Sequence, residues 1–272
     1  MNELLIAFSY GFMQRALIVG VLISIVAALI GVVIVLRKSS MIGDGLSHVA
    51  FSVFAIAVVL GMAPLWVALP VVAIFACLIM KVGQNRKINN DSLIAILSAS
   101  SLAIGTIVIS ISQGVNIDLN SYLFGSILSV SWVDVTIAAI LTLIVVLIYI
   151  FTYNRIFIIA FDEESARASG VKTNVYNTIF AMICAVVIVL GMRLLGALLI
   201  SSLIVFPTII AMKIVKSFKG VVFVSVMISL VGFLTGLIFS YLLNIPTGST
   251  VVVVNLILLA ISYVVGLIRN KI

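Results

Sequence analysis

The stretch ALIVGVLISIVAALIGVVIVL, at residues 16–36, contains no charged side chain and is long enough to cross a lipid bilayer as a helix. A hydrocarbon core of about 30 Å requires about 20 apolar residues in helical form. Similar runs recur along the chain, at 46–60, 64–80, 92–112, 133–151, 176–192, 194–212, 221–243 and 249–268. They are too long and too poor in alternation for the strands of a membrane barrel. Because only helices and closed barrels satisfy the backbone in lipid, the sequence predicts an all-α, polytopic transmembrane helical bundle.

Two of the runs leave the number of spans open. The run at 46–60 is short, and the stretch from 176 to 212 is almost continuously apolar apart from Arg193. That stretch can form two spans in a hairpin or one long, broken helix. We therefore expect eight or nine spans.

The composition excludes most classes of soluble protein. Of the 272 residues, 64% are hydrophobic and 8% are charged, and the mean hydropathy is +1.45. Typical soluble domains are about 45–50% apolar and about 25% charged. A soluble enzyme, a disordered chain, a coiled coil and a nucleic-acid-binding domain all fit poorly. The net charge of +7 does not indicate a nucleic-acid partner, because Lys and Arg determine orientation in membrane proteins.

The basic residues predict how the chain is oriented. Nine spans with an external N-terminus place all 15 Lys and Arg residues on the cytoplasmic side except Arg15 and Arg193. This bias is what the positive-inside rule requires, and it predicts a cytoplasmic C-terminus. The external loops, at 113–131 and 243–250, are too short for a folded domain, so we expect one transmembrane domain over residues 1–272.

The sequence lacks the short motifs of several enzyme classes. It contains no G-x-x-x-x-G-K-[ST] motif, which would bind nucleotide phosphates, and no HExxH, GxSxG or CxxC motif. We therefore expect a transport subunit and not an enzyme. If ATP drives transport through this chain, a separate polypeptide must hydrolyse it.

Asp44 and His48 are the strongest candidates for a binding site. They lie in MIGDGLSHVAF, residues 41–51, and His48 is the single histidine of the chain. Residues four apart share one face of a helix, and ionisable groups at membrane depth are functional candidates by default. A carboxylate and an imidazole suit a divalent ion such as Zn²⁺ or Mn²⁺. The alternative is structural, with Asp44 as a helix N-cap and His48 as an interfacial side chain bonded to the backbone.

The most polar stretch is FDEESARASGVKTN, residues 161–174, here called the polar segment. Asp162 is expected to cap a helix whose first turn contains Glu163 and Glu164, and Gly170 fits the position after the C-cap. The pattern predicts a short helix on the cytoplasmic surface. It is either a solvated connector or a docking helix for a cytoplasmic motor subunit, and its length and caps favour docking.

The segment IPTGST, residues 245–250, precedes the last apolar run. Pro246 and Gly248 are expected to break the helix, and the neighbouring hydroxyl groups to bond to the freed backbone. The segment is either a plain turn or part of an external gate. Elsewhere, Ser201 and Ser202 are expected to serve helix packing, and Asp134 to be solvated or a cap.

Four stretches, in this order, make the chain resemble the membrane subunit of zinc/manganese-type metal-ion ABC importers. They are FMQRALIVGVL with VVIVLRKSSMIGDGLSHVAF, then DLNSYLFGSIL, then FDEESARASGV, then RLLGALLISSLIVFP with PTGSTVVVV. The resemblance covers essentially the whole chain. The G-D-x-[LI]-S-H core and the D-E-E-x-A-x-x-x-G helix are fairly specific when they occur together. One departure is SSLIVF before Pro207, where relatives often have smaller residues.

The resemblance implies the translocation subunit of an ATP-driven importer of divalent metal in the cell membrane of a prokaryote. Such permeases form homodimers around a central pathway, bind two cytoplasmic ATP-hydrolysing subunits, and receive metal from an extracellular or periplasmic binding protein. Asp44 and His48 match the family's metal-binding pair. The residues that match the segment contacting the ATPase are Asp162, Glu163, Glu164, Arg167 and Gly170.

The D-E-E of the polar segment and the P-T-G-S-T before the last run resemble the zinc members of this family more closely, and this resemblance favours zinc over manganese or iron. The metal is then the transported substrate, and no permanently bound cofactor is expected. The alternative from another class is a secondary transporter or channel that works alone and uses Asp44 as a proton or cation site.

Overall fold

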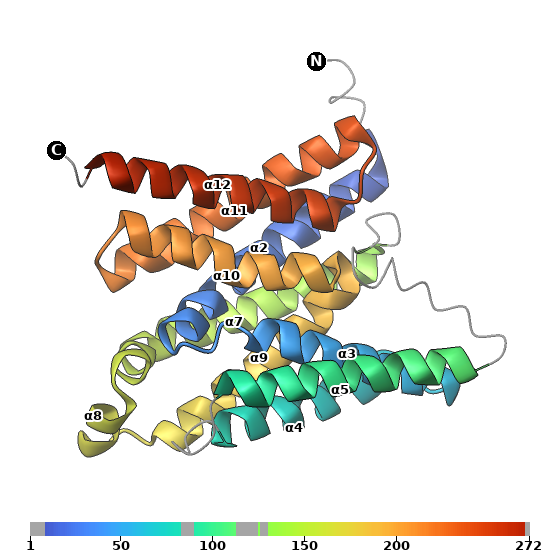
Figure 1. Cartoon of the computed structure of the whole chain (residues 1–272), viewed down its shortest axis with the longest axis horizontal. Coiled ribbons are helices and arrows are strands. Elements are labelled where there is room, and N and C mark those ends of the chain that lie inside the picture. The colour runs from blue at the N-terminus through green and yellow to red at the C-terminus, as the bar shows by residue number, and fades with distance from the viewer. Residues whose placement is uncertain (1–8, 83–89, 113–124, 126–129, 270–272) are drawn as a thin grey trace.

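The computed structural model describes residues 9–82, 90–112, 125 and 130–269 (Figure 1). Over this part of the chain the regular structure is helical, and no strand is present. The long helices are α2 (Gly11–Leu36), α3 (Ile42–Val59), α4 (Pro64–Val82), α5 (Asn90–Ile111), α7 (Trp132–Phe161), α9 (Thr173–Leu195), α10 (Ala197–Ile214), α11 (Phe218–Leu243) and α12 (Thr247–Arg269). A short helix, α8 (Glu163–Ala168), lies between α7 and α9.

Within the described ranges, 9 helices are long and apolar enough to cross a membrane, which confirms the predicted all-α bundle. The stretch from 176 to 212 forms two helices, because Gly196 between α9 and α10 has a φ of 94°. Glycine adopts a positive φ at little cost because it has no Cβ. The break is therefore at Gly196, and Arg193 lies in the last turn of α9. The predicted external loop at 113–131 falls mostly outside the described residues.

α2 lies at the centre of the bundle and packs against α7, α9, α10 and α11. Figure 1 shows it passing between α10, α11 and α12 on one side and α3, α4 and α5 on the other. A Cβ at Gly20 would overlap the ring of Phe233 of α11, and one at Gly31 would overlap the backbone carbonyl of Ile204 of α10. Small residues at such crossings let membrane helices approach closely. These glycines therefore fix the position of α2 against α10 and α11.

α3, which carries Asp44 and His48, packs against α4, α5, α9 and α10. Its first turn lies close to α5, because a Cβ at Gly45 would collide with the side chain of Ile94. The other side of α5 is exposed, because only 11% of the residues in its most apolar 18-residue stretch are buried. For α12 the corresponding share is 28%. The outer faces of α5 and α12 are therefore available to lipid or to a second polypeptide.

Candidate functional site

Asp44 and His48 lie on one face of α3. The helix begins at Ile42 with Met41 as its N-cap, so Asp44 sits inside the first turn and does not cap the helix. The predicted alternative, in which Asp44 is the N-cap, is therefore wrong: the N-cap is Met41, three residues earlier. The Nε2 atom of His48 is 3.6 Å from Oδ1 of Asp44. A carboxylate in the first turn of a helix is stabilised by the helix dipole. Because Asp44 and His48 both belong to α3, the backbone of that helix fixes their spacing.

The two side chains differ in how far they are buried. The Asp44 side chain is 49% exposed and that of His48 is 16% exposed. The Nδ1 atom of His48 is buried and has no hydrogen-bond partner among the described residues. The predicted backbone bond of His48 is thus not seen at this nitrogen. The pair presents a carboxylate that solvent can reach, with an imidazole one helical turn deeper.

A complete metal shell is not present in the described part of a single chain. No group of three or more His, Cys, Asp or Glu side chains that could hold a metal ion occurs there. A divalent ion bound by Asp44 and His48 would therefore take its remaining ligands from water or from another polypeptide. The assignment of the two residues as metal ligands stays a prediction.

Helix α10 adds a hydroxyl group beside the first turn of α3. The Oγ atom of Ser201 lies 3.9 Å from the position that a Cβ on Gly43 would occupy. This oxygen is buried and has no hydrogen-bond partner among the described residues. The neighbouring Ser202 accepts a hydrogen bond of 3.1 Å from the amide of Asn255 on α12, which fits its predicted packing role. Ser201, which was predicted to serve helix packing alone, is thus a polar group next to the candidate site.

The polar segment forms α8 with the caps that the sequence predicts. The carboxylate of Asp162 accepts hydrogen bonds from the backbone N–H groups of Glu164 and Ser165, at 3.0 and 3.1 Å. The Ser165 hydroxyl also donates to it, and these hydrogen bonds hold the pKa of Asp162 below its usual range. Gly170 has a φ of 80° and follows the C-cap residue Ser169.

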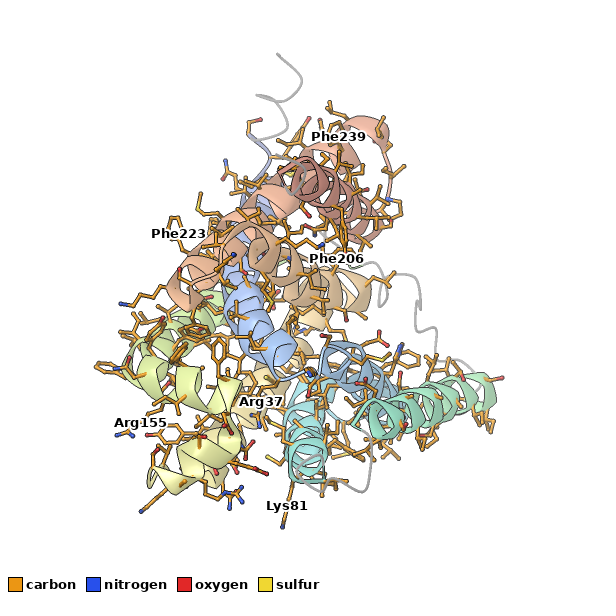
Figure 2. All side chains as sticks on the ribbon, turned by 60° about the vertical axis from the view of Figure 1, so that its left-hand side comes forward. Arg37, Lys81, Arg155, Phe206, Phe223 and Phe239 are labelled. Atoms are coloured by element: carbon orange, nitrogen blue, oxygen red, sulfur yellow. The ribbon has the colours of Figure 1, made fainter. Side chains whose placement is uncertain are left out.

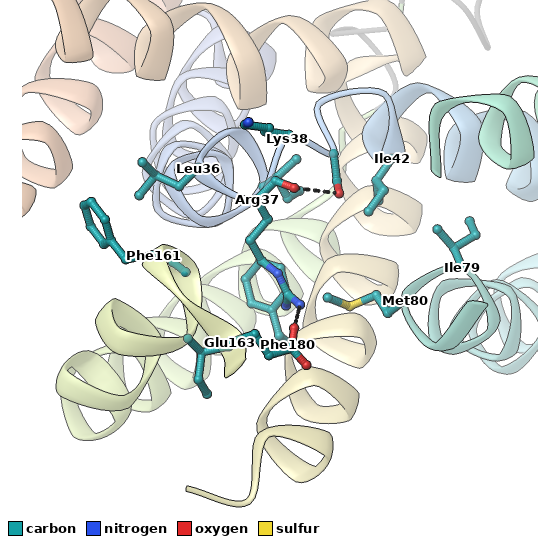
Figure 3. A pocket seen from close by; sticks show the side chains of 13 residues that line it. Leu36, Arg37, Lys38, Ile42, Ile79, Met80, Phe161, Glu163 and Phe180 are labelled. Carbon is teal, nitrogen blue, oxygen red and sulfur yellow. Dashed lines mark hydrogen bonds and ion pairs between the residues drawn. The ribbon is translucent and has the colours of Figure 1, made fainter. Parts of the chain in front are cut away.

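Three side chains connect α8 to the bundle, and we call them the Arg37 cluster: Arg37, Glu163 and Asn177. The guanidinium of Arg37, directly after α2, donates to Glu163 of α8 at 2.7 Å and to Asn177 of α9 at 2.8 Å. The amide of Asn177 donates to Glu163 at 2.9 Å. Figure 3 shows Arg37 directed from the end of α2 toward Glu163. Three segments far apart in the sequence therefore share one hydrogen-bonded cluster.

The Arg37 cluster is largely buried. The side chains of Arg37 and Glu163 are 15% and 22% exposed, and Asn177 is buried. Burial lowers the pKa of the Arg37 guanidinium, and Glu163 opposes this effect. Arg167 extends the cluster outward with a longer contact of 3.5 Å to Glu163. Charge-assisted hydrogen bonds of this kind are about twice as strong as neutral ones, so the cluster is a firm connection.

A cavity of about 280 Å³ lies beside the Arg37 cluster (Figure 3). Arg37, Lys38 and Glu163 supply its charged groups, and Met80 of α4 and Phe180 of α9 contribute apolar walls. Arg37 was predicted only to set the orientation of the chain, and Asn177 was not among the predicted site residues. The sequence does contain one signal for Arg37: it is a basic residue directly after a predicted span and shortly before Asp44.

The break before α12 differs slightly from the prediction. Asn244 adopts a left-handed conformation with a φ of 52°, and α12 begins at Thr247, directly after Pro246. Gly248 is buried inside the first turn of α12, so it does not break the helix as predicted. The hydroxyl of Thr250 donates to the carbonyl of Pro246 at 2.8 Å, which confirms the predicted bonding to the backbone. A gating role for Pro246 and Gly248 stays a prediction.

At the start of α7, Asp134 forms a reciprocal capping box with Ser131. Asp134 is buried and lies 3.7 Å from the guanidinium of Arg193 at the end of α9. Of the two predicted roles, the cap is confirmed and solvation is wrong. This ion pair connects the start of α7 to the end of α9.

Comparisons with known proteins point to one family. The sequence model of the ABC 3 transport family matches residues 9–266. The manganese import system permease protein ScaB of Streptococcus gordonii is 29% identical over 94% of this chain and 92% of its own length. The high-affinity zinc uptake system membrane protein ZnuB of Haemophilus influenzae is 28% identical over 91% of this chain and 95% of its own.

A solved structure extends the similarity to the fold. The structure of PsaBC from Streptococcus pneumoniae in complex with Fab contains a chain that is 29% identical, with a TM-score of 0.85. The match covers 96% of this chain and 95% of that one. The fold is therefore shared over nearly the whole length, and the resemblance seen in the sequence is confirmed. The chain belongs to the ABC 3 transport family.

Proposed function

We propose that this chain is the translocation subunit of an ATP-driven importer of divalent metal ions. It is a transport subunit and not an enzyme, and ATP is hydrolysed on a separate partner. The membrane-spanning fold, the absence of a phosphate-binding motif and the printed names of similar proteins support this proposal.

The observation that best supports ATP-driven transport is the Arg37 cluster. The cluster connects a short surface helix to the end of the central span, which would let that helix pass on the movement of a partner subunit. Here Glu163 of α8 is joined to Arg37, and the chain then passes through only a short turn before α3 and Asp44. A movement of α8 would therefore reach the candidate metal site by a short, hydrogen-bonded route.

The transported ion is a divalent metal, with zinc as the leading candidate and manganese and iron as alternatives. Asp44 and His48 supply one carboxylate and one imidazole, which suit both Zn²⁺ and Mn²⁺. The incomplete shell in the described part of one chain favours weak binding and release, as transport requires. The related proteins include both a manganese and a zinc system, so their names do not decide between the two metals.

The proposed assembly contains two copies of this chain, two cytoplasmic ATPase subunits and an extracellular or periplasmic metal-binding protein. A homodimer whose copies face each other would bring two Asp44 and two His48 side chains to one pathway. The proposed setting is the cell membrane of a prokaryote, with the C-terminus and α8 on the cytoplasmic side and one transmembrane domain per chain. ATP-driven closure of the ATPase subunits would act on α8 and switch the access of the pathway between the two sides.

Reconstitution into liposomes tests this proposal. The chain is inserted alone or together with its ATPase subunits, and radioactive zinc or manganese uptake is measured with and without ATP. We expect uptake only with the ATPase subunits and ATP. Metal flux through the chain alone, without ATP, would instead establish the stand-alone cation transporter.

A further inference from the structure

A groove on the outer side of the bundle lies apart from Asp44, His48 and α8. It has a volume of about 500 Å³, lies between α7 and α11, and includes Leu29 of α2. Its walls are mainly apolar, and Val146 and Ile150 of α7 face Val222 of α11 across it. The volume falls in the range of about 300–1,000 Å³ that is usual for small-molecule sites.

The position of the groove within the membrane follows from the aromatic residues that join its two helices. The ring centroid of Phe218, the first residue of α11, lies 5.0 Å from that of Phe157 and 5.3 Å from that of Tyr153, both on α7. Phe157 lies in the last turns of α7, just before α8. These contacts therefore place the start of α11 at the same surface of the bundle as α8.

Four residues with polar side-chain atoms line this otherwise apolar groove: Tyr149, Tyr153, Asn154 and Lys219. Asn154 and Lys219 lie toward the surface that carries α8, and Lys219 is in the first turn of α11, where the helix dipole favours an anion. Tyr149 precedes Asn154 by five residues, so it lies about 7.5 Å deeper along α7 at about 1.5 Å per residue. Among the described residues, the groove lining contains a cation, Lys219, and no acidic residue.

The hydroxyl of Tyr149 provides an independent sign of a ligand. Tyr149 is 8% exposed, and its hydroxyl is buried without a hydrogen-bond partner among the described residues. A buried hydroxyl without a partner is unfavourable, so a bound acceptor would stabilise it. The groove also faces outward, because Phe223 on its α11 side is 68% exposed and points away from the bundle in Figure 2. On a membrane-spanning protein this side meets lipid.

We propose that the groove binds one anionic phospholipid of the leaflet on the side of α8. An acyl chain lies against Val146, Ile150 and Val222. The hydroxyl of Tyr149 donates to an ester carbonyl of the lipid, and Lys219 with Asn154 binds the phosphate. A headgroup with net negative charge is preferred because Lys219 is the one charged residue that the described part of the chain contributes to the lining. This inference does not depend on which ion the chain transports.

Native mass spectrometry of the purified, delipidated full chain tests the inference, with added phosphatidylglycerol or phosphatidylcholine as probes. We expect phosphatidylglycerol to bind more tightly than phosphatidylcholine. Lys219→Ala should weaken phosphatidylglycerol binding about fivefold, since one lysine at a membrane surface contributes about 1 kcal/mol. Tyr149→Phe should weaken the binding of both lipids, because both carry the ester carbonyl.

Two matched variants control this experiment. Lys219→Arg keeps the charge and should retain the lipid, whereas Lys216→Ala removes an exposed cation that does not line the groove and should change nothing. Equal affinity of the wild type and Lys219→Ala for phosphatidylglycerol would overturn the inference. So would disulfide-linked dimers of Phe223→Cys in native membranes, because a second copy of the chain would then cover the groove.

Discussion

Arg37 and Glu163 are 126 residues apart in the sequence, and their side chains form an ion pair of 2.7 Å. Arg37 directly follows α2, the central helix, and Glu163 begins α8 on the surface. α3, with Asp44 and His48, starts a short turn after Arg37. The ion pair thus connects the segment proposed to receive the ATPase signal to the helix proposed to hold the metal.

Replacing Glu163 by Gln should uncouple ATP hydrolysis from transport. The substitution keeps the size of the side chain but removes the charge that holds Arg37, and charged hydrogen bonds contribute about 1.5–3 kcal/mol. We expect the assembled transporter to hydrolyse ATP while moving less metal per ATP. The measurement is the ratio of metal imported to ATP hydrolysed in liposomes.

Glu164→Gln is the matched control, because Glu164 is the next residue of α8, is exposed and lies outside the Arg37 cluster. Glu164 also belongs to the segment predicted to contact the ATPase, so Glu164→Gln should lower the ratio, but less than Glu163→Gln does. A ratio that falls equally in both variants would show that acidity of α8 matters in general and that the ion pair with Arg37 has no special role.

Gly170 should tolerate Asn far better than Val. The space around Gly170 is open, since a Cβ there would meet no atom within 4 Å, so only its φ of 80° restricts the residue. Asn adopts this left-handed conformation with little strain, whereas a β-branched residue does not. We expect Gly170→Val to reduce co-purification of the ATPase subunit, and Gly170→Asn to preserve it. Equal co-purification of both variants would show that the conformation at Gly170 does not contribute to the docking surface.

Gly31→Ala should destabilise the bundle. Its Cβ would meet the backbone carbonyl of Ile204, which cannot move aside as a side chain could, and overpacking of this kind costs about 1–3 kcal/mol. Gly266→Ala in α12 is the control, because no atom lies within 4 Å of that Cβ. Thermal unfolding in detergent should show a lower Tm for Gly31→Ala only. An unchanged Tm would mean that α2 and α10 are not in close contact.

The sequence predicted those features that are encoded locally. Apolar run length predicted the spans, and the Asp162 cap and Gly170 followed from the residue types that end helices. The start of α3 was predicted wrongly, because the helix already includes Ile42 and Gly43, which precede Asp44. No side chain caps this end of the helix to mark its start.

Contacts between distant segments could not be predicted in the same way. The bond between Arg37 and Glu163 depends on where α2 and the end of α7 meet in the folded bundle. The approach of Ser201 to Gly43 depends on the packing of α10 against α3. Hydropathy identifies which segments are buried in the membrane, but it does not specify which neighbours they meet.

The central claim is that the metal ion passes Asp44 and His48. Its most direct test is radioactive zinc uptake by cells that lack their own importer and express this chain with its partner subunits. Uptake by the Asp44→Ala, His48→Ala double variant should fall by more than about tenfold, because loss of a ligand's supporting contact alone costs about 10–100-fold. Thr136→Ala, an exposed position bonded only within α7, should transport normally. Normal uptake by the double variant at wild-type expression would contradict the account.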